Sequence, residues 1–276
     1  MRKILVPLTG RPLDRRAVAT AFLVAGRFGG CVEGLSVMPQ VEVRTSIESA
    51  AIPKALVEQL LRIGQAEQTE VVDSARRLFD EARAGHPAVP AAWRQATGPL
   101  AETLSEEARL ADLVVIAQAS DGTNAMGPAI EAALFGSGRP LLLAALEEPA
   151  TLGERIAVAW DGGPAAARAV GAALPFLTGA GTVTILSADS PGAGRVADPR
   201  RLADYLALQG VTAGIHGVTP SGRAVSAALV EAARETGCDL LVMGAYGHSR
   251  VREMVLGGVT QDVLRRPPPL PILMAH

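Results

Sequence analysis

Short apolar runs alternate with longer amphipathic stretches along the whole chain. The apolar runs, such as Ile4 to Val6 and Leu240 to Met243, are bounded by turn residues, a pattern typical of buried strands. In the longest amphipathic stretch, Lys54 to Arg83, apolar residues recur at steps of three and four, which predicts a helix. Pro53 precedes this helix, and Gly85 ends it. Other helices are predicted over Ala165 to Leu177, Pro199 to Leu208 and Ser221 to Glu235.

The alternation of strands and helices occurs twice, because the second half of the chain echoes the first at four places. The matched segments are Val6 to Pro12 with Val158 to Pro164, Cys31 to Ser36 with Thr182 to Ser187, Ala111 to Ile116 with Cys238 to Met243, and Pro140 to Ala144 with Pro271 to Ala275. Strands that alternate with helices form parallel sheets with right-handed crossovers. We therefore predict an α/β fold of two tandem doubly wound domains, each a five-stranded parallel sheet with helices on both faces. In such sheets a ligand binds beyond the carboxyl ends of the strands, where the strand order reverses.

The domain boundary is predicted in the short polar segment from Glu147 to Gly153, which gives domains 1–148 and 154–276. The length of 276 residues agrees with this division, since a domain takes ~100–200 residues. Hydrophobic residues make up 49% of the chain but aromatic residues only 3%, so the cores must consist mainly of aliphatic side chains. That composition suits parallel strands covered on both faces.

Charge and cysteine usage narrow the range of partners. The net charge is -2 and the basic residues are scattered, which disfavours nucleic acid as a partner. Cys31 and Cys238 lie far apart without a CxxC partner, so we expect buried thiols rather than a disulfide or a metal site. No apolar run reaches the ~18 residues of a membrane span, and the start of the chain predicts a strand rather than a secretory signal. We expect a soluble, cytoplasmic protein.

One strand end is richer in glycine than the others. After the run that ends at Met243 come Gly244 and Gly247, and Gly257-Gly258-Val259-Thr260 then begins a helix predicted to end at Arg265. Glycine lets the backbone approach a ligand closely, and the first N–H groups of a helix bind anions. Any one of these glycines could simply make a tight turn, but the spacing as a whole favours a site for a phosphate chain.

This spacing resembles the Gly-x2-Gly-x9-Gly-Ser/Thr motif that follows the fourth strand in the universal stress protein family, which has an adenine nucleotide alpha hydrolase-like fold. Gly244, Gly247 and Gly257 fall at the motif's spacing, and Val259-Thr260 agree with the Val-Thr ending common in the family. Gly258 departs from it, because the family usually has Ser or Thr there; the lost hydroxyl is worth about 1.5–3 kcal/mol if it would bond a charged phosphate. The resemblance implies that the second half binds ATP, together with Mg²⁺, or a related adenine nucleotide.

The resemblance adds two further residues to the expected site. The family places an Asp beside the ribose at the end of its first strand, and Asp161 matches it. Ala188 falls where the end of the second strand contributes backbone to adenine recognition. Asp161 is equally well explained as a cap or turn residue before the helix that begins near Pro164, and one side chain could serve both purposes.

The first half resembles the same family without its motif. Thr9 stands at the Asp position, no Gly-x2-Gly follows the fourth strand at Ala117 to Gly122, and the segment that reaches Gly136 to Arg139 is shorter. The resemblance implies that this half does not bind ATP. It also implies a partner surface, because such domains usually pair and a tandem can form an intrachain pseudo-dimer; a homodimer of the whole chain stays open.

Three functions remain after these observations. The leading hypothesis is a stress-response regulatory or protective module, in which ATP alters a surface that an unknown protein partner recognises. The alternative is a scaffold that binds no nucleotide and works through protein contacts. An ATP pyrophosphatase would need a Ser-Gly-Gly-x-Asp-Ser loop, and Asp161-Gly162-Gly163-Pro164 lacks its serines. Because the sequence shows no placed Mg²⁺ ligands and no residue to position a nucleophile, it favours a binder, with slow hydrolysis at most, over a dedicated enzyme.

Overall fold

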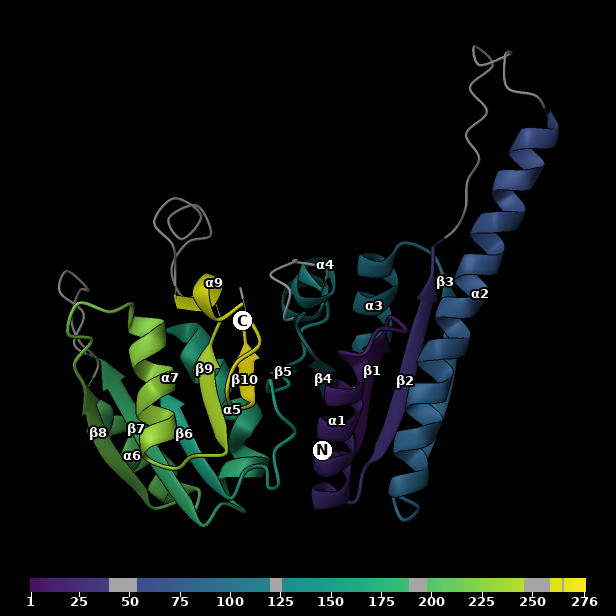
Figure 1. The fold of residues 1–276 in the computed structure, drawn as a ribbon. Helices are drawn as coiled ribbons and strands as arrows, with labels where there is room; N and C mark the ends of the chain where they lie inside the picture. The colour runs from purple at the N-terminus through teal and green to yellow at the C-terminus, as the bar shows by residue number, and fades with distance from the viewer. Residues whose placement is uncertain (40–53, 120–125, 189–197, 246–258, 265) are drawn as a thin grey trace.

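The computed structural model describes residues 1–39, 54–119, 126–188, 198–245, 259–264 and 266–276. They form one ten-stranded sheet with helices on both faces (Figure 1), in the order β3-β2-β1-β4-β5-β10-β9-β6-β7-β8. The elements of the first half are β1 (Lys3–Leu8), α1 (Asp14–Phe28), β2 (Cys31–Met38), α2 (Lys54–Gly85), β3 (Ala91–Thr97), α3 (Leu100–Ala108), β4 (Leu113–Ile116), α4 (Gly127–Glu131), the π-helical turn η1 (Ala132–Gly136) and β5 (Leu141–Leu143). Those of the second half are β6 (Arg155–Ala159), α5 (Pro164–Leu177), β7 (Thr182–Ala188), α6 (Pro199–Leu208), β8 (Ala213–Val218), α7 (Val225–Glu235), β9 (Leu240–Gly244), α9 (Val259–Val263) and β10 (Ile272–Ala275).

The strands within each half are all parallel, which confirms the predicted α/β class and the repeated strand–helix order. The predicted helix boundaries agree closely except at the start of α7 and the end of α9. Helix α7 begins at Val225 rather than Ser221, because Ser221 and Gly222 have φ angles of 49° and 80° and form a left-handed turn that a helix cannot include. Helix α9 ends at Val263, before the predicted Arg265, which lies outside the described residues.

The two halves join edge to edge. Strand β10 pairs with β5 in antiparallel orientation, with Leu273 opposite Leu142, and this pairing makes the two sheets continuous. On one face Phe28 and Phe176 stack edge-on at 4.8 Å between ring centroids. Arg27 of α1 also donates to the carbonyl oxygens of Gly153 at 3.0 Å and Gly179 at 2.6 Å. The predicted intrachain pairing is confirmed by these contacts.

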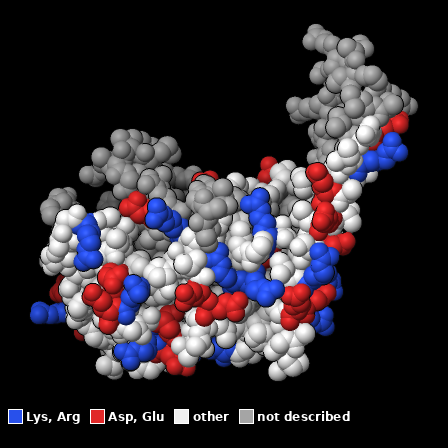
Figure 2. All heavy atoms as spheres, in the orientation of Figure 1, with Lys and Arg blue, Asp and Glu red and all other residues white. Residues whose placement is uncertain are grey.

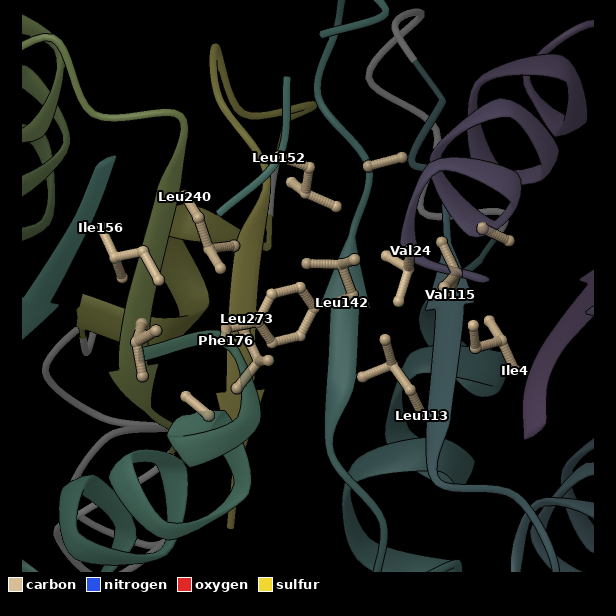
Figure 3. Packing of buried hydrophobic residues seen from close by; sticks show 14 of the residues in the cluster. Ile4, Val24, Leu113, Val115, Leu142, Leu152, Ile156, Phe176, Leu240 and Leu273 are labelled. Carbon is tan, nitrogen blue, oxygen red and sulfur yellow. The ribbon is translucent and has the colours of Figure 1, made fainter. Parts of the chain in front are cut away.

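Each face of the sheet carries one apolar core that draws on both halves. Figure 3 shows part of the core on the α1, α2, α5 and α6 side, where residues of the first half meet residues of the second. The labelled side chains from the two halves are Ile4, Val24, Leu113, Val115 and Leu142, and Leu152, Ile156, Phe176, Leu240 and Leu273. The other face is covered by α3, α4, α7 and α9. The division into domains 1–148 and 154–276 therefore stays a prediction about the sequence repeat, since the packing is shared.

The repeated aspartates before the fourth strand of each half hold the start of the first strand. Asp112 accepts hydrogen bonds from the backbone N–H groups of Arg2 at 2.5 Å and Lys3 at 3.1 Å. The hydrogen bond from Arg2 is the main reason that the pKa of Asp112 is lowered. Asp239 accepts from more donors, which are the hydroxyl of Thr151 and the N–H groups of Gly153, Glu154 and Arg155. The end of the polar segment between the halves is thus fixed, and Leu152 within it is buried.

Surface features agree with the composition. Lys and Arg alternate with Asp and Glu on the face shown in Figure 2, without a large patch of one sign. Helix α2 extends well beyond the sheet (Figure 1). Cys31 and Cys238 are free thiols, as predicted. Both are half-buried, whereas the prediction was that they are buried. No helix in the described ranges is both long and apolar enough to cross a membrane.

Candidate functional site

The strand order of the second half reverses beside β6, which lies between β9 and β7. Asp161 follows β6 closely, Ala188 is the last residue of β7, and Gly244 is the last residue of β9. Parallel strands bring their carboxyl ends to the same edge of a sheet, which is where doubly wound proteins bind ligands. Three of the predicted site residues therefore lie on neighbouring strand ends at this reversal point.

Asp161 makes a turn and also faces solvent. Its Oδ1 accepts a hydrogen bond from the backbone N–H of Gly163 at 2.7 Å, which closes a turn two residues long. No side chain caps α5, whose N-cap residue is Gly163, so Asp161 is a turn residue rather than a helix cap. The side chain is exposed, and Oδ2 has no hydrogen-bond partner among the residues that the structure describes. A ligand at this edge could therefore use Oδ2 while the turn stays intact.

Gly244 is required by packing. A Cβ atom at this position would lie 2.5 Å from the backbone nitrogen of Ala166 and 2.8 Å from the carbonyl carbon of Ala165. The end of β9 therefore approaches the first turn of α5 so closely that only glycine fits there. This packing explains the first glycine of the motif without a ligand, and a role for Gly244 in phosphate binding stays a prediction.

The helix that follows the motif is placed at the same edge. Val259 begins α9, and Thr260 in its first turn is buried, with 3% of its surface exposed. Ser226 of α7 donates to Asp262 at 3.2 Å, and Val263 packs into the apolar core. Three predicted site residues, Gly247, Gly257 and Gly258, lie outside the described residues, and so does the side chain of Val259.

Trp160 is a residue that the sequence analysis did not select. It directly follows β6, and its indole Nε1–H is shielded from solvent without a hydrogen-bond partner among the described residues. A buried donor without a partner is uncommon in proteins. The ring packs against the apolar core, so this shielded donor belongs to the packing at the strand end rather than to the exposed surface around Asp161. The sequence signal was a tryptophan directly after a buried strand, in a chain with only two.

The corresponding reversal point of the first half is filled by its own side chain. Asp14 of α1, 1% exposed, accepts from the backbone N–H of Thr9 at 2.7 Å, the hydroxyl of Thr9 at 3.1 Å and the N–H of Gly10 at 2.8 Å. Burial raises the pKa of Asp14 to about 6, although the hydrogen bonds from Thr9 and Gly10 oppose the increase. Helix α2 covers the turn as well, since Ser74 donates to the carbonyl of Gly10 at 3.0 Å.

Several comparisons relate this architecture to known proteins. Residues 153–275 match the model of the universal stress protein family. A stretch of 39 residues is 49% identical to universal stress protein Slr1230 of Synechocystis sp. (strain ATCC 27184 / PCC 6803 / Kazusa), and this match spans only 14% of the chain and 14% of that relative. The solved structure of a universal stress protein from Archaeoglobus fulgidus DSM 4304 has a TM-score of 0.68 at 17% identity, over 99% of this chain and 97% of that one. A functionally unknown protein from Pseudomonas aeruginosa PAO1, PA1789, has a TM-score of 0.57 at 14% identity, over 100% of this chain and 92% of that one. Both structures share the fold of the whole tandem.

Proposed function

We propose that this chain, whose residues 153–275 match the model of the universal stress protein family, binds one adenine nucleotide at the reversal point beside β6. The proposed ligand is ATP with Mg²⁺, and the proposed role is a regulatory or protective module of the cytoplasmic stress response. The observation that carries the proposal is the difference between the two reversal points. Asp161 is exposed beside a glycine-rich strand end, whereas Thr9 at the matching place is bonded to a buried aspartate.

The roles of the residues follow from their chemistry. The Oδ2 of Asp161, which has no hydrogen-bond partner in the described part of the chain, would accept a hydrogen bond from a ribose hydroxyl. The glycines of the motif and the first N–H groups of α9 would surround the phosphate chain, since helix starts favour anions. Mg²⁺ would arrive with the nucleotide and offset part of the phosphate charge. We propose a binder rather than a dedicated enzyme, and this arrangement is compatible with slow hydrolysis.

A scaffold that works through protein contacts is the second candidate. It is favoured by apolar side chains exposed at the outer end of the second half. Leu208 is 83% exposed, Ile215 46% and Tyr205 42%. Exposed apolar side chains that lie together mark interaction surfaces more often than isolated ones do. Under this proposal the partner is a protein, and nucleotide has no effect on it.

Calorimetric titration with Mg-ATP separates the two candidates. We expect the wild type to bind close to one nucleotide per chain, and Asp161→Ala to weaken binding about tenfold or more, because a hydrogen bond to a charged group is lost. Asp161→Asn keeps an oxygen for the Gly163 turn and tests the charge alone. Asp204→Ala is the matched control, since Asp204 is exposed on α6 of the same half. No heat of binding at millimolar ATP from folded wild type would refute the nucleotide proposal and favour the scaffold.

A further inference from the structure

A buried side chain of the first half contacts the helix of the proposed site in the second half. Gln118 lies just beyond β4 and is 5% exposed. Its Nε2 donates to the backbone carbonyl of Leu264, directly after α9, at 2.5 Å. The N–H of Leu264 in turn donates to the carbonyl of Thr260 at 3.0 Å. Two hydrogen bonds therefore connect the first half to the first turn of α9.

The backbone of Gln118 is itself anchored. Arg16 of α1 donates to the carbonyl of Gln118 at 2.5 Å and to the carbonyl of Ala145 at 3.4 Å. Ala145 follows β5, whose edge pairs with β10. In addition, the N–H of Leu146 donates to the carbonyl of Pro268, between α9 and β10, at 2.7 Å. The amide of Gln118 thus extends from a fixed point on the seam between the halves.

The sequence repeat relates Gln118 to a second contact between the two halves. In the sequence repeat Gln118 corresponds to Ala245, because Asp112 corresponds to Asp239. Nδ1 of His276 donates to the carbonyl oxygen of Ala245 at 3.0 Å, and the ring lies edge-on against Phe135 of η1 at 4.7 Å between ring centroids. The turn η1 precedes β5 as α9 precedes β10. Each half therefore supports the last helical segment of the other.

The environment of Gln118 argues against a purely stabilising role. Its Oε1 is buried and has no hydrogen-bond partner among the described residues. An unpaired buried amide oxygen is unfavourable, so an apolar side chain of the same size would suit this position at least as well for stability. What an apolar side chain could not supply is the donor to Leu264.

We propose that Gln118 is a positioning residue for the nucleotide site, through which the first half controls the nucleotide affinity of the second. By holding the carbonyl of Leu264, Gln118 fixes the direction of α9 and with it the position of Thr260. This inference rests on the proposed function. Because coupling between two sites is reciprocal, bound nucleotide would also strengthen the contact between Gln118 and Leu264.

The test compares Gln118→Met with Gln95→Met, which makes the same change at an exposed position on β3, the outer edge of the first half. We expect Gln118→Met to raise the Kd for Mg-ATP about 3- to 10-fold, as for the loss of one hydrogen bond, and Gln95→Met to leave it unchanged. Amide hydrogen exchange at Val263 and Leu264 should become faster in Gln118→Met without nucleotide, while exchange at Met274 of β10 stays the same.

Gln118→Glu adds a rescue that a general loss of structure would not show. A carboxylate at this position cannot donate, whereas the protonated acid can, and burial shifts the pKa of such a group upward. The ratio of the Kd of Gln118→Glu to that of the wild type should therefore fall toward one between pH 7.5 and pH 5.5. The same ratio for Gln118→Met should not change.

The outcomes distinguish a failure of the role of Gln118 from a failure of nucleotide binding itself. Wild type that binds ATP, with Gln118→Met within twofold of it and unchanged exchange at Leu264, overturns the role of Gln118 and leaves the proposed function standing. Wild type that binds no ATP overturns both. Weaker binding by Gln118→Met, with faster exchange confined to α9 and recovery of Gln118→Glu at low pH, supports the inference.

Discussion

The two reversal points of this chain have the same position in the sheet and different contents. In the first half the turn after β1 directs two backbone N–H groups at Asp14, and α2 covers it. In the second half the backbone N–H of Gly163, in the turn after β6, donates to Asp161, whose side chain stays exposed. In the first half, the buried carboxylate of Asp14 lies at the reversal point, which is where doubly wound proteins bind ligands. The comparison shows that the first half keeps the same fold with a buried side chain at its reversal point.

The largest expected effect concerns two matched glycines. Gly10 and Gly162 have φ angles of 74° and 75° in corresponding turns. A Cβ at Gly10 would lie 2.5 Å from the carbonyl oxygen of Val71 in α2. Gly10→Ala should therefore lower the free energy of unfolding by about 4 kcal/mol, from left-handed strain plus overpacking against α2, and Gly162→Ala by about 1 kcal/mol from the left-handed strain that both positions share. Urea unfolding of both variants measures this, and equal losses would contradict the view that α2 closes the first turn.

The second prediction uses the pKa of Asp14. Its folded-state value of about 6 lies above the ordinary 3.8, so between these values the folded state binds the proton more strongly than the unfolded chain. Asp14 therefore favours folding fully below pH 3.8, and this contribution is lost as the pH rises through about 6. Relative to Asp14→Asn, the wild type should lose about 2.5 kcal/mol of unfolding free energy between pH 4 and pH 7. Chemical denaturation of both proteins across this range measures the difference, and parallel curves would show that Asp14 is not the titrating group.

The third prediction compares the aspartates that hold the first strand of each half. Asp239 accepts four hydrogen bonds at the junction between the halves, and Asp112 accepts two near the start of the chain. Asp239→Ala should lower the free energy of unfolding by about 2 kcal/mol and Asp112→Ala by about 1 kcal/mol, since part of each group's bonding is replaced by water. Thermal and urea unfolding measure both losses. A larger loss for Asp112→Ala would contradict the view that Asp239 contributes more to stability than Asp112.

Much of the fold could be predicted from the sequence, because its signals are local. The period of the apolar residues determines helix or strand, and the repeat determines that the order occurs twice. The antiparallel pairing of β5 with β10 could not be predicted in register, because Leu141 to Leu143 are uniformly apolar and contain no signal for a partner. The shared core follows from that pairing and was missed with it.

The candidate site was predictable only in part, because some of its contacts join residues that come together only in the folded chain. Asp161, Ala188, Gly244 and Thr260 follow from the motif and strand ends, and the structure places them at one edge. Asp14 has the sequence appearance of an ordinary acid in a first helical turn, and only the geometry turns it toward Thr9 and Gly10. Gln118 interrupts an apolar run, which is a signal in itself, but its partner Leu264 lies in the other half and could not be named from the sequence.

The edge-to-edge seam between β5 and β10 also determines how the protein responds to dilution. Two separate domains that pair in this way would dissociate as their concentration falls, and their melting temperature would fall with it. Here both edges belong to one chain, so each meets the other at the effective concentration of a tether rather than that of the solution. The seam, and with it the contact between Gln118 and Leu264, is therefore as complete in a single molecule as in a concentrated solution.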